Sequence, residues 1–171
     1  MSEALDGWSE FNVAMVGATA ALAGLLIVAM SVNIGEIMKT DTLPSRAAAA
    51  IATLVVAIVA TALGLVPGQP HWLYGAEVLA ATLIAWVFEV HAIRTIIGEP
   101  GRNTGQRVAK STVGMLPLAA FLTGAVLLIA GGAGAGLAVV TSGLGFLAAG
   151  SVLAVATAIL YAWIVLVEVL R

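Results

Sequence analysis

Four ionisable side chains lie inside long apolar segments of this sequence, where a charged group is costly and commonly serves a function. Glu77, Glu89 and His91 share one segment, and Glu168 lies in the last. Carboxyl and imidazole groups take up and release protons and can hold cations. Their types and positions therefore predict proton or cation chemistry, provided that the surrounding elements position them for it.

Glu77 and His91 fall on one face of a helix. Their spacing places them within about 40° of one line and about 21 Å apart along the axis. Ile84 and Phe88 lie between them on the same face. Such a face can line a narrow pore or proton path with an apolar constriction. The alternative is that Glu77 reaches water near one membrane surface and that His91 makes local contacts near the other.

Glu89 lies about 120° around the helix from Glu77, and Arg94 is too far around the same helix to pair with it easily. A carboxyl group buried at this position needs a partner from another helix, or it stays protonated. Two interpretations remain open, a structural pair between helices and a proton or cation site. The candidate partners are Arg46, Arg107 and Lys110.

Glu168 stands three residues before Arg171. This is the spacing of an ion pair on a helix surface. It predicts an interfacial pair that anchors the last apolar segment.

No catalytic residue, cofactor or metal site is predicted. The chain has no cysteine, and its two histidines, His71 and His91, lie on opposite sides of the expected membrane, so they cannot supply a zinc site or a bis-histidine haem. Serine-elbow and phosphate-loop motifs are absent. We therefore expect a protein that is not an enzyme, and the lack of a basic, aromatic patch argues against binding to nucleic acid.

The composition indicates that lipid surrounds the chain. Hydrophobic residues make up 61% of it and charged residues 9%, and the mean hydropathy is +1.11. A soluble domain carries roughly 25% charged residues to cover its surface. The lipid bilayer is accordingly the expected partner, and the expected fold is an all-α integral membrane bundle forming a single domain over residues 1–171.

Five segments are long enough to cross a bilayer, which takes about 20 apolar residues in a helix. Prolines at 44, 67 and 100 and a glycine-rich run at 131–136 separate them. Residues 137–140 either lie in the interface or extend the fifth segment. The expected spans are 11–34, 47–66, 72–97, 113–130 and 144–170.

All cationic side chains fall on one side of this arrangement. Cytoplasmic loops carry an excess of Lys and Arg, so the sequence predicts an N-terminus outside and a C-terminus in the cytoplasm. The seven residues are Lys39, Arg46, Arg94, Arg102, Arg107, Lys110 and Arg171.

Small residues follow one line along the first span, at Gly17, Ala21 and Gly24. Such a line lets helix backbones approach closely in a membrane. It serves either packing within the chain or a seam between subunits of a homo-oligomer. Asn12 and Asn33 lie near the two ends of this span, where we expect water to be close.

Four apolar segments of the chain, taken together, resemble segments of known proteins. They are the first span from Phe11 to Ser31, the segments 43–47 and 65–69, and the closing segment 162–171. With these, the chain resembles small multi-pass inner-membrane proteins of high-GC bacteria that have no named functional family. The resemblance implies a bacterial inner (plasma) membrane location and brings no activity or site residues with it.

Three functions remain open at this stage. The first is a protein that acts through self-assembly, as a homo-oligomeric channel for ions or protons. The second is a non-catalytic accessory or scaffold subunit that binds other membrane-protein subunits. The third is a small-solute transporter, which the absence of an internal repeat disfavours.

The orientation can be tested with single cysteines, because the chain has none of its own. With Arg102→Cys, we expect no reaction with a membrane-impermeant thiol reagent in intact cells and full reaction once the cells are opened. Ala133→Cys, in the loop without cations, is the matched control and should react in intact cells. Labelling of Arg102→Cys from outside would contradict the predicted topology.

Overall fold

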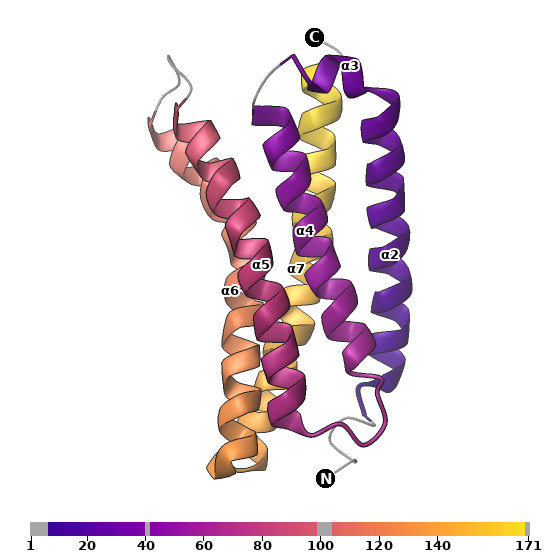
Figure 1. Cartoon of the computed structure of the whole chain (residues 1–171), viewed down its shortest axis with the longest axis vertical. Helices are drawn as coiled ribbons and strands as arrows, with labels where there is room; N and C mark the ends of the chain where they lie inside the picture. The colour runs from indigo at the N-terminus through magenta and orange to yellow at the C-terminus, as the bar shows by residue number, and fades with distance from the viewer. Residues whose placement is uncertain (1–6, 40–41, 99–103, 170–171) are drawn as a thin grey trace.

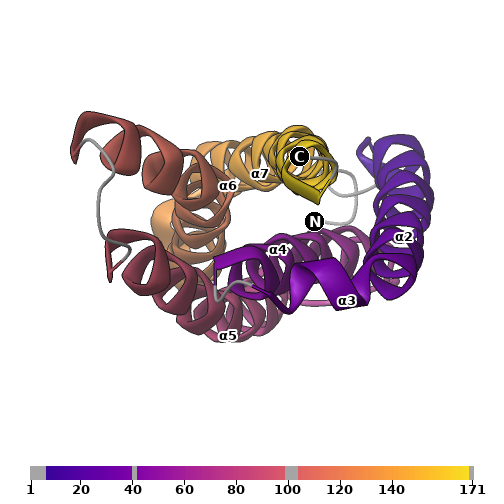
Figure 2. The ribbon, with the colours of Figure 1, turned by 90° about the horizontal axis from the view of Figure 1, so that it is seen from above.

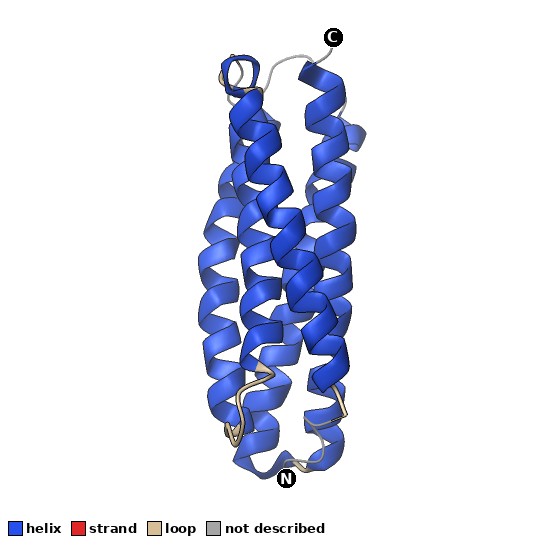
Figure 3. Ribbon diagram, turned by 90° about the vertical axis from the view of Figure 1, so that its right-hand side faces the viewer, coloured by secondary structure: helices blue, strands red, loops and turns tan. Residues whose placement is uncertain are grey.

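The computed structural model describes residues 7–39, 42–98 and 104–169. These residues form helices and turns, and no strand occurs among them (Figure 3). The elements in order are α2 (Ser9–Val32), α3 (Ile34–Ile37), α4 (Thr42–Leu63), α5 (His71–Gly98), α6 (Thr104–Ala130), the π-helical segment η1 (Gly131–Ala135) and α7 (Leu137–Val169).

The expected all-helical fold with five long apolar helices is confirmed, because five helices are long and apolar enough to cross a membrane. They run side by side along the long axis of the molecule (Figure 1). We call one end of the bundle the α3 end and the other, with the start of α2 and the α4–α5 turn, the η1 end.

Helix α4 lies between α2 and α5, across from α7, and packs against all three (Figure 2). Over its apolar stretch 56% of the residues are buried, compared with 17% in α2. Helix α6 completes the arrangement by packing against α5 and α7. Helix α2 is therefore peripheral, and most of its surface faces away from the other helices.

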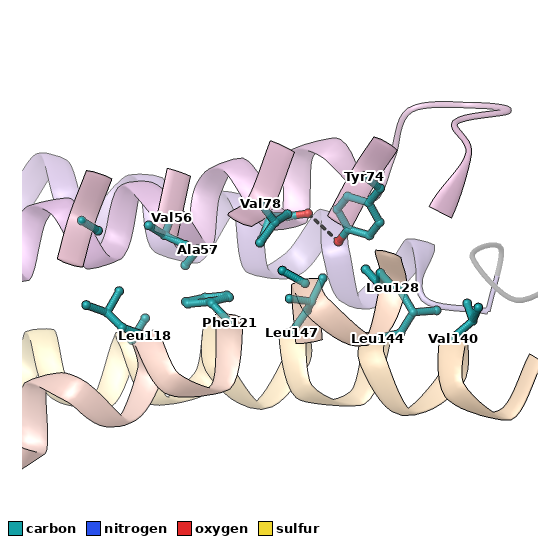
Figure 4. Close-up of a cluster of buried hydrophobic side chains, with 14 residues drawn as sticks. Val56, Ala57, Tyr74, Val78, Leu118, Phe121, Leu128, Val140, Leu144 and Leu147 are labelled. Atoms are coloured by element: carbon teal, nitrogen blue, oxygen red, sulfur yellow. Dashed lines mark hydrogen bonds between the residues drawn. The ribbon is translucent and has the colours of Figure 1, made fainter. Parts of the chain in front are cut away.

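The main core lies where α4, α5, α6 and α7 meet. Phe121 of α6 is fully buried, between Leu118 and Leu147 in Figure 4. A Cβ atom at Gly150 of α7 would lie 3.0 Å from Cδ1 of Phe121, so the glycine lets this ring rest directly on the α7 backbone. Close packing of this kind holds apolar helices together where burial from water cannot.

Helix α6 contains Pro117, which is fully buried. Proline removes one backbone N–H donor, clashes with the preceding turn and bends a helix. The N-terminal part of α6 leans away from α4 and α7 together with the end of α5 (Figure 1).

Three helices begin more than four residues earlier than the expected spans, and the first of these is α6, which begins at Thr104 rather than at residue 113. Helix α7 begins at Leu137 rather than at residue 144, as in the alternative in which residues 137–140 extend the fifth segment. The Gly136 carbonyl accepts hydrogen bonds from the N–H groups of Val139 (3.2 Å) and Val140 (3.4 Å). The preceding turn depends on Gly134 and Gly136, whose φ angles of 105° and 94° lie in the left-handed region that favours glycine. Helix α4 begins earlier than expected, since Pro44 lies within its first turn, where proline is tolerated.

Candidate functional site

Helix α5 presents two different faces. The outer face carries the predicted pore residues: Ile84 is 64% exposed and Phe88 45%, and His91 is exposed as well. The face therefore does not line the interior of a single chain. A path along it requires a second protein surface, so the stripe from Glu77 to His91 remains a prediction about an assembly.

Glu77 lies on this outer face at the η1 end and is partly buried. Its Oε2 accepts a hydrogen bond from Nε2 of Gln69, in the turn before α5. The alternative for this residue, that it reaches water near one membrane surface, stays a prediction.

The inner face of α5 is formed by Val78, Thr82, Ala85 and Glu89, which recur at helical spacing and are all buried. Glu89 is 3% exposed. Among the described residues, its Oε2 has no hydrogen-bond partner. This is the most deeply buried carboxyl group whose side chain the structure describes.

Gly114 of α6 faces the other oxygen of Glu89. A Cβ atom at Gly114 would collide with Oε1 of Glu89 and with the hydroxyl of Tyr161 from α7. The glycine therefore leaves the space into which both polar groups project. Tyr161 is also buried, at 7% exposure.

Arg46 is the fourth residue of this site. It lies in the first turns of α4 and is 2% exposed. Both Arg46 and Glu89 lie within electrostatic range of the Tyr161 hydroxyl. No salt bridge joins Arg46 to Glu89 in the part of the chain that the structure describes. We call Arg46, Glu89, Gly114 and Tyr161 the Glu89 junction, since four different helices contribute to it.

The other predicted partners of Glu89 cannot be placed. The side chains of Arg107 and Lys110 lie outside the described residues, as do the side chain of Glu168 and the whole of Arg171. The interfacial pair of Glu168 and Arg171 therefore stays a prediction. Within the described ranges, the salt bridge that occurs joins Lys39 to Glu36, on the surface, at 2.6 Å.

The small-residue seam of α2 faces outward. Gly17, Ala21 and Gly24 are exposed, and a Cβ atom at either glycine would meet nothing within 4 Å. Packing within the chain instead uses the opposite side of α2, where Ala23 and Leu26 contact a cluster with Leu54 and Ala158. The seam is therefore not used inside one chain, and its role between subunits stays a prediction.

The chemical capacity of the Glu89 junction is limited to a few groups. Among the described side chains, it offers one carboxyl, one phenol and one guanidinium group, and all three residues are buried. No cluster of three His, Cys, Asp or Glu side chains that could hold a metal ion occurs in the described ranges. Gain and loss of a proton at Glu89 is the simplest chemistry that these groups allow.

Comparison with models of protein families, with curated proteins and with solved structures gives no match. Functional inference therefore depends on the geometry of the bundle alone.

Sequence reasoning selected Glu89 and Arg46 but missed Gly114 and Tyr161. Tyr161 continues a line of buried residues on α7 that includes Ala154 and Ala158, and this helical spacing was a usable signal. No pattern in the sequence marked Gly114, because its role depends on which side chains other helices place opposite it.

The junction predicts opposite effects for two glycine substitutions. Gly114→Ala should lower the free energy of unfolding by about 1–3 kcal/mol, because the added methyl group overpacks the space used by Glu89 and Tyr161. Gly145→Ala, where nothing lies within 4 Å, should leave this free energy unchanged or raise it by up to about 1 kcal/mol.

Equilibrium unfolding in mixed detergent micelles measures both variants. Tyr161→Phe in the Gly114→Ala background removes one of the colliding oxygens and should recover part of the loss. Equal effects of Gly114→Ala and Gly145→Ala would show that the junction is not packed as described.

Proposed function

We propose that this chain is a multi-pass protein of a bacterial inner membrane that moves protons through the interior of its own bundle. In this proposal, Glu89 is the group that takes up and releases the proton. The observation that carries the proposal is the burial of this carboxyl group at a junction of four helices, with one oxygen lacking a partner among the described residues. Intramembrane carboxyl groups of this kind commonly form proton relays.

The membrane location is supported by the five apolar helices and by the charge distribution along the sequence. If the cationic loops are cytoplasmic, the α3 end faces the cytoplasm and the Glu89 junction lies in the cytoplasmic half of the bilayer. The distance that a proton travels between Glu89 and the cytoplasm would then be shorter than the distance between Glu89 and the opposite side of the membrane.

A proton fits the junction better than a metal ion does. Divalent cations require several oxygen ligands, usually including more than one carboxylate, whereas Glu89 is the single carboxyl group at the junction among the side chains that the structure describes. Arg46 adds a positive charge within range of the same hydroxyl, and this charge disfavours a bound cation.

The path from Glu89 toward the η1 end is closed by packing. Leu118 and Phe121 are 0% exposed, as is Val78, which lies about 16 Å from Glu89 along α5. Proton transfer needs a chain of hydrogen-bonding groups, so water has to enter this region before a proton can cross. We therefore expect the entry of water to limit the rate of proton flux.

Proton flux into liposomes tests the proposal directly. With Glu89→Gln, flux should fall on the order of 100-fold or more, since an amide does not ionise near neutral pH and cannot act as the acid and base that carries the proton. Glu77→Gln is the matched control, because this carboxylate lies on the outer face and should leave the flux nearly unchanged. Absence of flux above that of empty liposomes, or wild-type flux with Glu89→Gln, would refute the proposal.

A second function, in a different class, is assembly, either with further copies or as a scaffold for other membrane subunits. The exposed seam of Gly17, Ala21 and Gly24 favours it, because small residues allow a second helix to approach closely. A homo-oligomer of this kind would also place the Glu77–His91 stripe against a neighbouring protein surface.

The seam predicts that Gly17→Leu and Gly24→Leu weaken association by roughly tenfold or more, an effect of about 1.4 kcal/mol. Ala18→Leu is the matched control, since Ala18 is exposed but lies about 100° around the helix from Gly17. Single-molecule photobleaching in bilayers reports the number of copies. Mass analysis after mild extraction separates the two versions: one repeated chain supports self-assembly, and a defined foreign subunit supports the scaffold. A monomer in both measurements would exclude this function.

A further inference from the structure

A buried imidazole group lies at the η1 end, where α5 begins. His71 is the first residue of this helix and is 8% exposed. Its Nδ1 atom is buried and has no hydrogen-bond partner among the described residues. The other histidine of the chain, His91, is exposed on the outer face of the same helix. Because a buried nitrogen atom without a partner is costly, a role in the interior of the bundle is reasonably sought for His71.

His71 and Glu89 lie on the same line of α5. Glu89 is eighteen positions after His71, which corresponds to five helical turns of 3.6 residues, so the two side chains leave the helix in the same direction about 27 Å apart along its axis. Between them on the inner face, Val78 and Thr82 are fully buried. One buried face of α5 therefore carries a group that can exchange protons toward each of its ends.

The interior at the η1 end offers few other groups of this kind. Residues 47–66 and 113–160 include most of α4, η1 and the parts of α6 and α7 near this end, and they contain no Asp, Glu, His, Lys, Arg, Cys or Tyr. On α5, Tyr74 donates its hydroxyl proton to a carbonyl oxygen of α4 at 2.8 Å, and Glu77 lies about 120° around the helix from the imidazole. Glu10 of α2 is exposed. Among the described residues, the imidazole is thus the buried group at this end that commonly gains and loses a proton near neutral pH.

We propose that His71 carries the proton at the η1 end of the interior path, a role that rests on the proton transfer proposed for Glu89. The imidazole takes up a proton on one ring nitrogen and releases a proton from the other, so that only N–H bonds form and break. Rotation of the ring or proton exchange with water returns it to its starting state. Intramembrane relays combine histidine with acidic side chains in this way.

The stretch between the two groups needs water, since Val78 and Phe121 are fully buried and apolar. Thr82 is the polar side chain on this stretch of the inner face. Its hydroxyl donates to the Val78 carbonyl oxygen at 2.7 Å, which leaves oxygen lone pairs that can accept a hydrogen bond from an entering water molecule. The path stays inside one chain and requires no second subunit.

Proton current across the membrane of proteoliposomes tests this role. With His71→Gln, which keeps a polar side chain but cannot carry a proton near neutral pH, the current should fall on the order of tenfold or more. His91→Gln is the matched control, because this histidine lies on the outer face of the same helix, and it should keep the wild-type current.

Comparison with Glu89→Gln separates the two proposals. Wild-type current with His71→Gln and loss of current with Glu89→Gln would overturn the role of His71 and leave proton transfer at Glu89 intact. The reverse pattern would refute the role of Glu89 alone. A wild-type current no larger than that of empty liposomes would refute both.

Added imidazole distinguishes a proton carrier from a residue that only supports the fold. In His71→Ala, free imidazole should restore part of the current in proportion to its concentration, because it can enter the vacated space and exchange protons. The same addition should restore nothing with Glu89→Gln, and empty liposomes with imidazole give the background. A folded His71→Ala variant whose current stays lost at every imidazole concentration would refute the role of a proton carrier. His71→Ser serves if His71→Ala does not fold.

Discussion

Helices in this bundle approach one another closely at glycine residues, and the rest of the structure depends on this contact. Gly150 brings the Phe121 ring of α6 onto the α7 backbone. Gly75 of α5 sets its backbone against α6, where a Cβ atom would lie 2.7 Å from the Ala125 carbonyl oxygen. When apolar side chains are surrounded by lipid, separating the helices exposes nothing to water, so packing at short range has to supply the cohesion.

The same contact positions the polar groups. Glu89 and Tyr161 project into the space beside Gly114, and Asn12 and Tyr74 project into the space beside Gly64. In each case a glycine, on α6 or in the turn after α4, makes room for polar side chains contributed by two other helices. A buried polar atom is costly without a hydrogen bond, and the Glu89 junction is accordingly where function is most reasonably sought.

Much of the fold follows from the sequence, because hydropathy, proline and the glycine run mark five helices and their approximate ends. The rotation of Glu89 away from the Glu77–His91 stripe was also predictable, since both lie on one helix with a fixed angle per residue. The contribution of Gly114 and Tyr161 was not, because it depends on how three helices cross. For the same reason, the small residues of α2 could be read as a seam, whereas its outward direction depended on the opposite side packing against Leu54 and Ala158.

The order of helices in the bundle has a consequence for biosynthesis. Helix α2 emerges from the ribosome first, yet part of the surface on which it packs belongs to α7. Helices α6 and α7, joined by the short η1 turn, form their extensive mutual contact as soon as both are made. The first helix therefore lacks part of its packing surface until the last one has been made.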